Sequence, residues 1–261
     1  MGGIVRLKTY KFDRNFMLWG KVGFCAAFQK ECVSAIINLP TEPVSATVGF
    51  LGIPAAISCM ENEKITEAYN ELTYVAIDGM PIVKKCERLG IRCERCSGPD
   101  IMNIIIKEGL EHGKTHYFYG GKNDAVLDKI KNNLTEKYPN INIVGMYSPP
   151  FRELTDAEDK AICEEINRLK PDYVWVGIGQ PKQDFWLMSH RNKLLDTTIL
   201  GVGAAFDFMA GTLDRAPKAV QDMGLEWLYR FIKEPKRLWN RYIAGGLKYM
   251  KLNKKYKSIK L

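Results

Sequence analysis

Residues 179–184, with the sequence GQPKQD, are polar although they follow an apolar run at 171–177. Such side chains pack poorly in a core but bind polar ligands well. Backbone N–H groups in a turn that leads into a helix can also bind anionic oxygens. We therefore expect Gln183 to reach a polar, anionic ligand, with Gly179, Pro181 and Lys182 lining the turn.

Five apolar runs with the composition of buried strands end in residues of this kind, at 72–78, 115–121, 141–147, 172–179 and 197–203. Their polar ends are Asp78, Gly120 with Gly121, Tyr147 with Ser148, residues 179–184, and residues 203–207 including Asp207. Apolar residues at helical spacing separate the runs, and a capping box at 155–158 opens one of the helices.

Strands and helices that alternate at these lengths predict an α/β fold: a Rossmann-like parallel sheet with helices on both faces. Ligands of such sheets bind outside the carboxyl ends of the strands, so the five polar ends should line one crevice. Tight turns explain any single loop equally well, but five together favour a site. Neither GxGxxG nor GxxxxGK[ST] occurs at these ends, which argues against a Rossmann dinucleotide or Walker-type enzyme.

Composition indicates a folded chain in a reducing compartment. The 261 residues are 46% hydrophobic, and the seven cysteines are odd in number and scattered. Cys93 and Cys96 have metal or redox spacing, but a structural zinc site needs two further ligands, so we interpret them as ordinary cysteines. Lys21 interrupts the apolar segment 15–28, and no apolar stretch reaches the length of a membrane span. We therefore expect a cytoplasmic chain.

The net charge of +8 is unevenly distributed. Residues 229–261 contain eleven Lys or Arg and one acid, Glu234, and carry +10, whereas the remaining 27 basic and 29 acidic residues give −2. We therefore expect this tail to bind an anionic partner. We divide the chain into an N-terminal region of undefined structure (1–45), an α/β catalytic domain (46–223) and a basic helical appendage (224–261).

With these segments in place, the chain resembles the WecG/TagA/CpsF family of glycosyltransferases over roughly residues 48–242. The resemblance rests on ordered motifs that are modest singly and specific together: AIDGMPIV, ERCSGPDIM, YFYGG, SPPF, VGIGQPKQDFW, GVGAAFDFMAGTLDRAP and GLEWLYRFIKEPKRLWNRY.

The resemblance implies sugar transfer from a UDP-sugar to a polyprenyl-diphosphate-linked saccharide at the cytoplasmic face of a bacterial plasma membrane, with inversion and without a metal. Displacement at an anomeric carbon needs a base for the acceptor hydroxyl and positive groups for the departing diphosphate. No DxD-type carboxylate pair follows a predicted strand, so we expect neither metal nor cofactor. The implied product belongs to cell-surface polysaccharide synthesis.

Several residues match positions of the family motifs. Asp78, in the DG motif, is the candidate base, although an aspartate here could instead cap the next helix. Arg95 and Ser97, in the ER motif, are candidates for binding substrate, and a surface ion pair is the alternative for Arg95. Gln183 and Asp207 match positions associated with the nucleotide sugar. Asp207 could accept hydrogen bonds from the ribose or cap the stretch that begins at Phe208.

One segment departs from the family pattern. Many relatives carry a Thr-Pro-Asn-like segment near the substrate, and the corresponding stretch here is LGIPAA, residues 51–56. Leu51 and Ile53 cannot make those hydrogen bonds. Either a neighbour such as Ser58 substitutes or the donor sugar differs, so we do not carry over N-acetylmannosamine as the donor.

The tail combines cations with tryptophan and tyrosine, and Pro235 divides it into two apolar stripes. Basic amphipathic helices of this kind lie on anionic membranes, while ordinary core packing and nucleic-acid binding are alternatives, the latter without a supporting motif. The resemblance implies that the tail places arginines over the active site, and Arg230, Arg237 and Arg241 are the candidates. The resemblance is also compatible with a homo-oligomer.

Two hypotheses from different classes follow. The first is a membrane-associated inverting glycosyltransferase that uses a lipid-linked acceptor and a UDP-sugar, the sugar being an N-acetylhexosamine or another hexose. The second, suggested by the altered segment at 51–53, is a catalytically inactive, peripheral nucleotide-binding scaffold.

Overall fold

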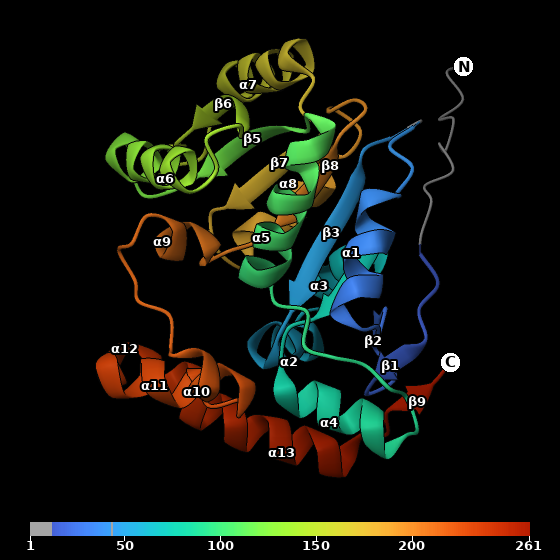
Figure 1. The fold of residues 1–261 in the computed structure, drawn as a ribbon. Helices are drawn as coiled ribbons and strands as arrows, with labels where there is room; N and C mark the ends of the chain where they lie inside the picture. Colours follow the sequence, from blue (N-terminus) through green and yellow to red (C-terminus); the bar gives the residue numbers. More distant parts are fainter. Residues whose placement is uncertain (1–11, 43) are drawn as a thin grey trace, which may run out of the picture.

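The computed structural model describes residues 12–42 and 44–261, except for the side chains of residues 218, 222, 237 and 241. Its centre is a six-stranded sheet in which every described pairing is parallel, with the strand order β4-β3-β8-β7-β5-β6 (Figure 1). The strands are β3 (Ala46–Leu51), β4 (Tyr74–Ile77), β5 (Thr115–Gly120), β6 (Asn142–Tyr147), β7 (Tyr173–Gly177) and β8 (Thr198–Gly201). This sheet confirms the predicted Rossmann-like α/β fold.

Helices cover both faces of the sheet. One hydrophobic core lies under α2 (Ile53–Glu61), α3 (Glu63–Glu71), α4 (Met80–Arg88), α7 (Asp156–Leu169) and α8 (Lys182–His190). The other lies under α1 (Gln29–Ile37), α5 (Gly98–Gly109), α6 (Asp124–Lys137) and α9 (Ala205–Met209). A short 3-10 turn, η1 (Leu110–His112), follows α5.

Strand residues alternate between the two cores, as the pleat requires. In β5, Tyr117 and Tyr119 pack into the first core and Phe118 into the second. Both faces are therefore apolar, which explains why these strands read as nearly continuous hydrophobic runs. The predicted capping box is also present: Glu158 N–H donates to Thr155 Oγ1 at 3.3 Å, and Thr155 N–H donates to Glu158 Oε2 at 2.8 Å.

A second, antiparallel sheet links the two ends of the chain. It has the order β2-β1-β9 and consists of β1 (Phe16–Leu18), β2 (Val22–Phe24) and β9 (Ile259–Lys260). Trp19 strengthens this link, since its backbone N–H donates to Ser258 Oγ at 3.2 Å and its indole donates to Asn253 Oδ1 at 2.9 Å. The sequence left this region undefined because strands of two or three residues carry almost no periodic signal.

The C-terminal helices lie across the end of the sheet toward which β3 points (Figure 1). They are α10 (Lys218–Asp222), α11 (Glu226–Lys233), α12 (Pro235–Trp239), the π-helical turn η2 (Asn240–Ala244) and α13 (Gly245–Lys255). Pro235 begins α12, in agreement with the predicted interruption. Tyr249 of α13 is buried, and its hydroxyl donates to the carbonyl of Pro81 at 3.1 Å. The tail is therefore packed onto the body of the protein.

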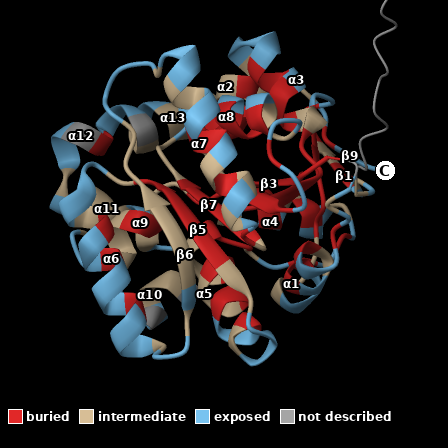
Figure 2. Cartoon of the chain, turned by 90° about the horizontal axis from the view of Figure 1, so that it is seen from above, coloured by how far each residue is buried: buried red, intermediate tan, exposed pale blue. Residues whose placement is uncertain are grey.

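The C-terminal helices also present apolar side chains to solvent. Figure 2 shows α11 and α12 mostly in the colours of exposed and half-buried residues, while β5 and β7 are buried. The exposed side chains include Trp227, Ile232, Trp239, Leu247 and Met250. In the part of the chain that the structure describes, none of the helices has the length and apolar character of a membrane span.

The seven cysteines are buried free thiols. Cys93 and Cys96 flank the segment that carries Arg95, and the thiol of Cys96 lies 3.7 Å from the carbonyl oxygen of Ala27. The division of the chain at residues 45 and 223 remains a prediction from the sequence. Within the predicted N-terminal region, residues 1–11 and residue 43 lie outside the described structure.

Candidate active site

The polar ends of the strands lie along the carboxyl edge of the sheet, because all six strands are parallel. Gly120 is required there: its φ is 143°, and a Cβ atom would lie 2.6 Å from the backbone of Gly177. Gly121 and Gly179 also have positive φ angles, both 82°. These glycines allow the chain to turn sharply where β5 and β7 end.

The strand order decides which polar ends meet. Asp78 follows β4, and Tyr147 ends β6, so they lie at opposite edges of the sheet. Five strand spacings of about 4.8 Å separate those edges, roughly 24 Å in total. Tyr147 is half-buried against Tyr119, with 5.8 Å between the ring centroids. Asp78 and Tyr147 are therefore not brought together.

Asp78 faces a guanidinium. Its Oδ1 lies 3.7 Å from Arg95 Nε, and its backbone N–H donates to the carbonyl of Leu51 at 2.9 Å. The N-cap of α4 is Gly79, so Asp78 does not occupy the capping position that was the alternative. Its carboxylate is partly exposed at the sheet edge, as a proton acceptor for a bound alcohol would need to be.

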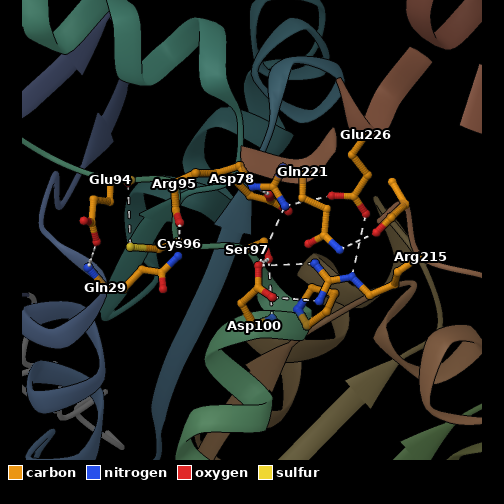
Figure 3. Close-up of polar contacts among 12 residues, drawn as sticks. Gln29, Asp78, Glu94, Arg95, Cys96, Ser97, Asp100, Arg215, Gln221 and Glu226 are labelled. Atoms are coloured by element: carbon orange, nitrogen blue, oxygen red, sulfur yellow. Dashed lines mark hydrogen bonds and ion pairs between the residues drawn. The ribbon is translucent and has the colours of Figure 1, made fainter. Parts of the chain in front are cut away.

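Arg95 belongs to a network of alternating charges (Figure 3). Its NH2 nitrogen lies 2.8 Å from Glu226 Oε2 and 3.7 Å from Asp100 Oδ2. Burial alone would lower the pKa of Arg95, but the carboxylates of Asp78, Glu226 and Asp100 raise it overall. The surface ion pair considered for Arg95 is in fact a half-buried network, which joins α11 to the sheet edge.

Arg215 closes this network on its other side. Its NH1 nitrogen lies 2.7 Å from Asp100 Oδ1, and its Nε lies 3.8 Å from Glu226 Oε1. Burial tends to raise the pKa of Asp100, but hydrogen bonds from Arg215 and Ser97 lower it overall. Ser97 is the N-cap of α5 and accepts from Asp100 N–H at 3.4 Å, so its hydroxyl is engaged in capping.

Gln183 lies beneath the sheet edge and is only 2% exposed. Its Nε2 donates to the carbonyl of Gly201 at 3.1 Å, while its Oε1 has no hydrogen-bond partner among the described residues. Pro181 and Lys182, at the start of α8, are exposed. Gln183 is thus anchored to β8, with one acceptor oxygen unused.

A buried polar cluster supports the turn before α8. The hydroxyl of Tyr69 donates to Asp184 Oδ2 at 2.5 Å and accepts from Gln180 Nε2 at 3.0 Å. Asp184 is 2% exposed, and burial raises its pKa to about 7 although these hydrogen bonds oppose the shift. This cluster ties α3 to the segment that the sequence singled out.

Asp207 is the third residue of α9, which begins at Ala205, so it does not cap a stretch starting at Phe208. Its Oδ1 lies 3.2 Å from Lys122 Nζ, just beyond Gly120 and Gly121. The carboxyl ends of β5 and β8 therefore contribute one ion pair to the edge. Sequence reasoning did not identify Lys122.

Arg230 reaches the same region from α11. Its guanidinium lies 5.7 Å from the ring centroid of Phe208, and that of Arg215 lies 5.5 Å from the same centroid. The side chains of Arg237 and Arg241 lie outside the described residues. Of the three predicted tail arginines, Arg230 can therefore be placed, beside Phe208 near the carboxyl edge of the sheet.

Sequence reasoning also missed Asp100, Arg215 and Glu226. All three lie inside the quoted motifs SGPD, LDRAP and GLEW. A useful signal was available for Glu226, which is an acid immediately before a strongly basic tail. Pairings across more than 100 residues, however, cannot be read from spacing along the chain.

One group of side chains has the composition of a metal site. Asp159, Cys163 and His190 place their ligand atoms within 4.8 Å of one another. The ammonium of Lys193 already lies 2.5 Å from Asp159 Oδ2, and His190 Nε2 lies 2.7 Å from Oδ1. Because α8 runs from the carboxyl edge of β7 toward the start of β8, this group is remote from Asp78.

Comparison with known proteins points to one family. The N-acetylglucosaminyldiphosphoundecaprenol N-acetyl-beta-D-mannosaminyltransferases of Staphylococcus aureus strains MW2, NCTC 8325 / PS 47 and MRSA252 are each 31% identical to the chain over 173 residues. The aligned part covers 66% of this chain and 66% of each relative. Residues 21–259 match the model of the glycosyl transferase WecG/TagA/CpsF family, and the chain therefore belongs to that family.

Proposed function

We propose that the protein is an inverting glycosyltransferase that moves a sugar from a UDP-sugar to a polyprenyl-diphosphate-linked saccharide at the cytoplasmic face of a bacterial plasma membrane. The names of the relatives describe transfer to a lipid-linked diphosphate acceptor. The observation that carries the proposal is the position of Asp78, a carboxylate at the carboxyl edge of the sheet beside Arg95 and beneath α11.

In the proposed reaction, Asp78 accepts the proton of the acceptor hydroxyl as that oxygen attacks the anomeric carbon. The bond from this carbon to the diphosphate oxygen breaks on the opposite face, which inverts the configuration. UDP leaves with the electron pair, and Arg95 and Arg230 stabilise the charge that develops on it. Cationic side chains would thus supply the stabilisation that a metal supplies in other transferases.

The segment at 51–53 bears on the donor. Gly52 lies close to Asp78, because a Cβ atom on it would be 2.8 Å from the Asp78 carbonyl oxygen. The hydroxyl of Ser58 donates to the carbonyl of Pro54 at 3.1 Å within α2, so it is already engaged. We therefore propose an N-acetylhexosamine or another hexose as the donor sugar, and do not specify N-acetylmannosamine.

A panel of UDP-sugars, each incubated with a synthetic lipid-diphosphate disaccharide or monosaccharide acceptor and analysed by mass spectrometry, tests this function. We expect one donor to give an acceptor lengthened by one sugar, with release of UDP. Binding of UDP and vesicles without any lengthened product would instead favour the inactive scaffold.

Metal removal is the next test. We expect sugar transfer in excess EDTA at the rate found with Mg²⁺, because the proposed charge stabilisation comes from arginines. Initial rates of UDP release in both buffers measure this. Strict dependence on Mg²⁺ would contradict the metal-independent mechanism.

The C-terminal helices supply the proposed membrane surface. Exposed Trp239 and exposed aliphatic side chains stand among the eleven cations of residues 229–261, and exposed Trp227 lies just before them, a combination that favours anionic bilayers. Phe231, Pro235 and Trp239 also line a hollow of about 610 Å³. We propose that this surface brings the crevice to the lipid-linked acceptor. Nucleic-acid binding is the alternative role for the charge of this tail, and self-association would be compatible with either role.

The variant Leu247→Ser tests this surface. Leu247 is 55% exposed on α13, and we expect its loss to weaken binding to phosphatidylglycerol vesicles by about fivefold, since less apolar area enters the bilayer. Vesicle sedimentation measures the partitioning. Leu195→Ser is the matched control, because Leu195 is 56% exposed in the loop before β8. Equal losses in the two variants would argue against α13 as the membrane surface.

Point variants are preferable here to truncation at residue 229. Truncation would remove β9 and Tyr249 and would leave Trp19 without partners that bury it. A loss of activity could then reflect a disturbed fold.

A further inference from the structure

Glu226 lies between two guanidiniums of the crevice (Figure 3). One carboxylate oxygen is 2.8 Å from Arg95, and the other is 3.8 Å from Nε of Arg215. The Glu226 side chain is 13% exposed, so this contact is largely shielded from solvent. Arginines bind a phosphate group in a similar way, because a phosphate also offers a separate oxygen to each guanidinium.

The charge of this cluster does not suit an anion site as it stands. Three carboxylates, those of Asp78, Asp100 and Glu226, surround the two guanidiniums of Arg95 and Arg215, which leaves a net charge of −1. A diphosphate would be repelled by this cluster. Removal of Glu226 from the cluster would leave no net charge and would free the donor of Arg95 that it occupies.

Unused donors point to a ligand with more oxygens than one carboxylate has. The Nε atoms of Arg215 and Arg230 are buried, and neither has a hydrogen-bond acceptor among the side chains that the structure describes. Both guanidiniums lie against the ring of Phe208, and that of Arg215 also lies beside Glu226. A buried donor without an acceptor is unfavourable, and the oxygens of a diphosphate could satisfy these donors.

Of the three carboxylates, Glu226 is the one that can leave. Asp78 is fixed at the end of β4 by its backbone hydrogen bond to Leu51, and Asp100 is held by Ser97 and Arg215 in the first turn of α5. Glu226 lies in the first turn of α11, a helix in which no residue is fully buried. Its withdrawal therefore needs no core side chain to move.

We propose that Glu226 is an internal stand-in for a diphosphate group. It occupies Arg95 and Arg215 while the crevice is empty, and a diphosphate displaces it, so that these two arginines and Arg230 form a diphosphate subsite. The identification of the diphosphate as part of a substrate rests on the proposed function. The subsite itself is defined by the geometry of the arginines, and it assigns a binding role to Arg215.

Calorimetric titration with inorganic pyrophosphate tests this proposal. In the variant Glu226→Gln the competing charge is absent, and we expect the Kd for pyrophosphate to fall about tenfold, which corresponds to about 1.4 kcal/mol. In Arg215→Gln we expect the Kd to rise about tenfold. Urea unfolding of each variant shows whether it is folded under the conditions of titration.

Asp214→Asn is the matched control. It removes one negative charge from the same part of the chain, but Asp214 is 75% exposed and pairs with Lys233 at 2.8 Å. We expect its Kd for pyrophosphate to stay within about twofold of wild type. A tenfold fall in this variant too would overturn the proposal, because general charge would then explain the gain.

Glu226→Asp provides a second variant in case the glutamine variant does not fold. It keeps the charge, but its shorter side chain cannot bridge both guanidiniums, so we expect a smaller fall in Kd. If neither Glu226 variant binds pyrophosphate more tightly than wild type, Glu226 is not a stand-in and the proposal is wrong.

Two further ligands distinguish the source of the diphosphate. A gain in affinity for UDP but not for farnesyl diphosphate would assign the subsite to the donor, and the opposite result would assign it to the lipid-linked acceptor. These experiments measure binding and do not depend on sugar transfer. Failure to observe sugar transfer would therefore contradict the proposed function without affecting the test of Glu226.

Discussion

The variant Asp78→Asn is expected to lower turnover by about 10²-fold or more, the usual scale for loss of a general base. Asparagine has nearly the same shape as aspartate and still presents an oxygen to Arg95, so the crevice should keep its form. UDP binding, measured by calorimetry, should change by less than about threefold. The expected defect is therefore in kcat.

Asp100→Asn is the control for this experiment. Asp78 and Asp100 each place a carboxylate oxygen 3.7 Å from Arg95, so both variants remove one negative charge from the same guanidinium. We expect Asp100→Asn to change mainly KM, because Asp100 accepts two hydrogen bonds from Arg215 and its proposed role is to position that arginine. Turnover of Asp78→Asn within a few-fold of wild type would remove Asp78 from the mechanism.

The second prediction with a large effect is that the stability of the protein depends on pH through Asp184. Burial raises the pKa of Asp184 from 3.8 to about 7 in the folded protein, and Tyr69 donates a hydrogen bond to its Oδ2. The other oxygen, Oδ1, has no partner among the described residues and can carry the proton. A shift of about three pKa units corresponds to about 4 kcal/mol.

The sign of this effect follows from proton binding. Between pH 4 and pH 7 the folded protein retains the Asp184 proton and the unfolded chain releases it, so stability falls as pH rises. The contribution of the Asp184 carboxyl to the free energy of unfolding is fully present below about pH 4 and is lost above about pH 7. An asparagine side chain cannot ionise, so Asp184→Asn should gain up to about 4 kcal/mol relative to wild type between pH 4 and pH 8.

Urea unfolding of both proteins at pH 4 and pH 8 measures this difference. The comparison of two pH values cancels any constant cost of the altered hydrogen bonds around Tyr69. Asp128→Asn, on the exposed face of α6, controls for the amide substitution. If the stability difference between Asp184→Asn and wild type were the same at both pH values, Asp184 would not be protonated in the folded protein.

Five of the six strands of the large sheet were predicted, because their signal is local, whereas β3 was not among the predicted strands. Each of the strands β4 to β8 is a short apolar run that ends in a polar or glycine-rich turn, and the runs of β4, β5, β7 and β8 are nearly continuous because both faces of the sheet are buried there. The helix at 156–169 carries its own capping box. Features of this kind depend on neighbours within a few residues, which the sequence displays directly.

The small sheet and the position of the tail were not predictable in the same way. β1 pairs with β9, so residues more than 240 positions apart form this sheet, with Phe16 opposite Lys260. Trp19 and Tyr249 pack together across a similar separation, with 5.4 Å between their ring centroids. Short strands and single aromatic residues have no periodic pattern from which such distant partners can be predicted.

For the site, the sequence by itself determined the residue types at the strand ends: the carboxylate after β4, the glycines after β5 and the polar turn before α8. Only the tertiary structure decided which of them meet. Strand order separates Tyr147 from Asp78, and folding buries Gln183 and Asp184. It also brings Glu226 from α11 onto Arg95 and Arg215. The physical reason is that backbone conformation depends on adjacent residues, whereas charge pairing depends on distances that exist only after the chain has packed.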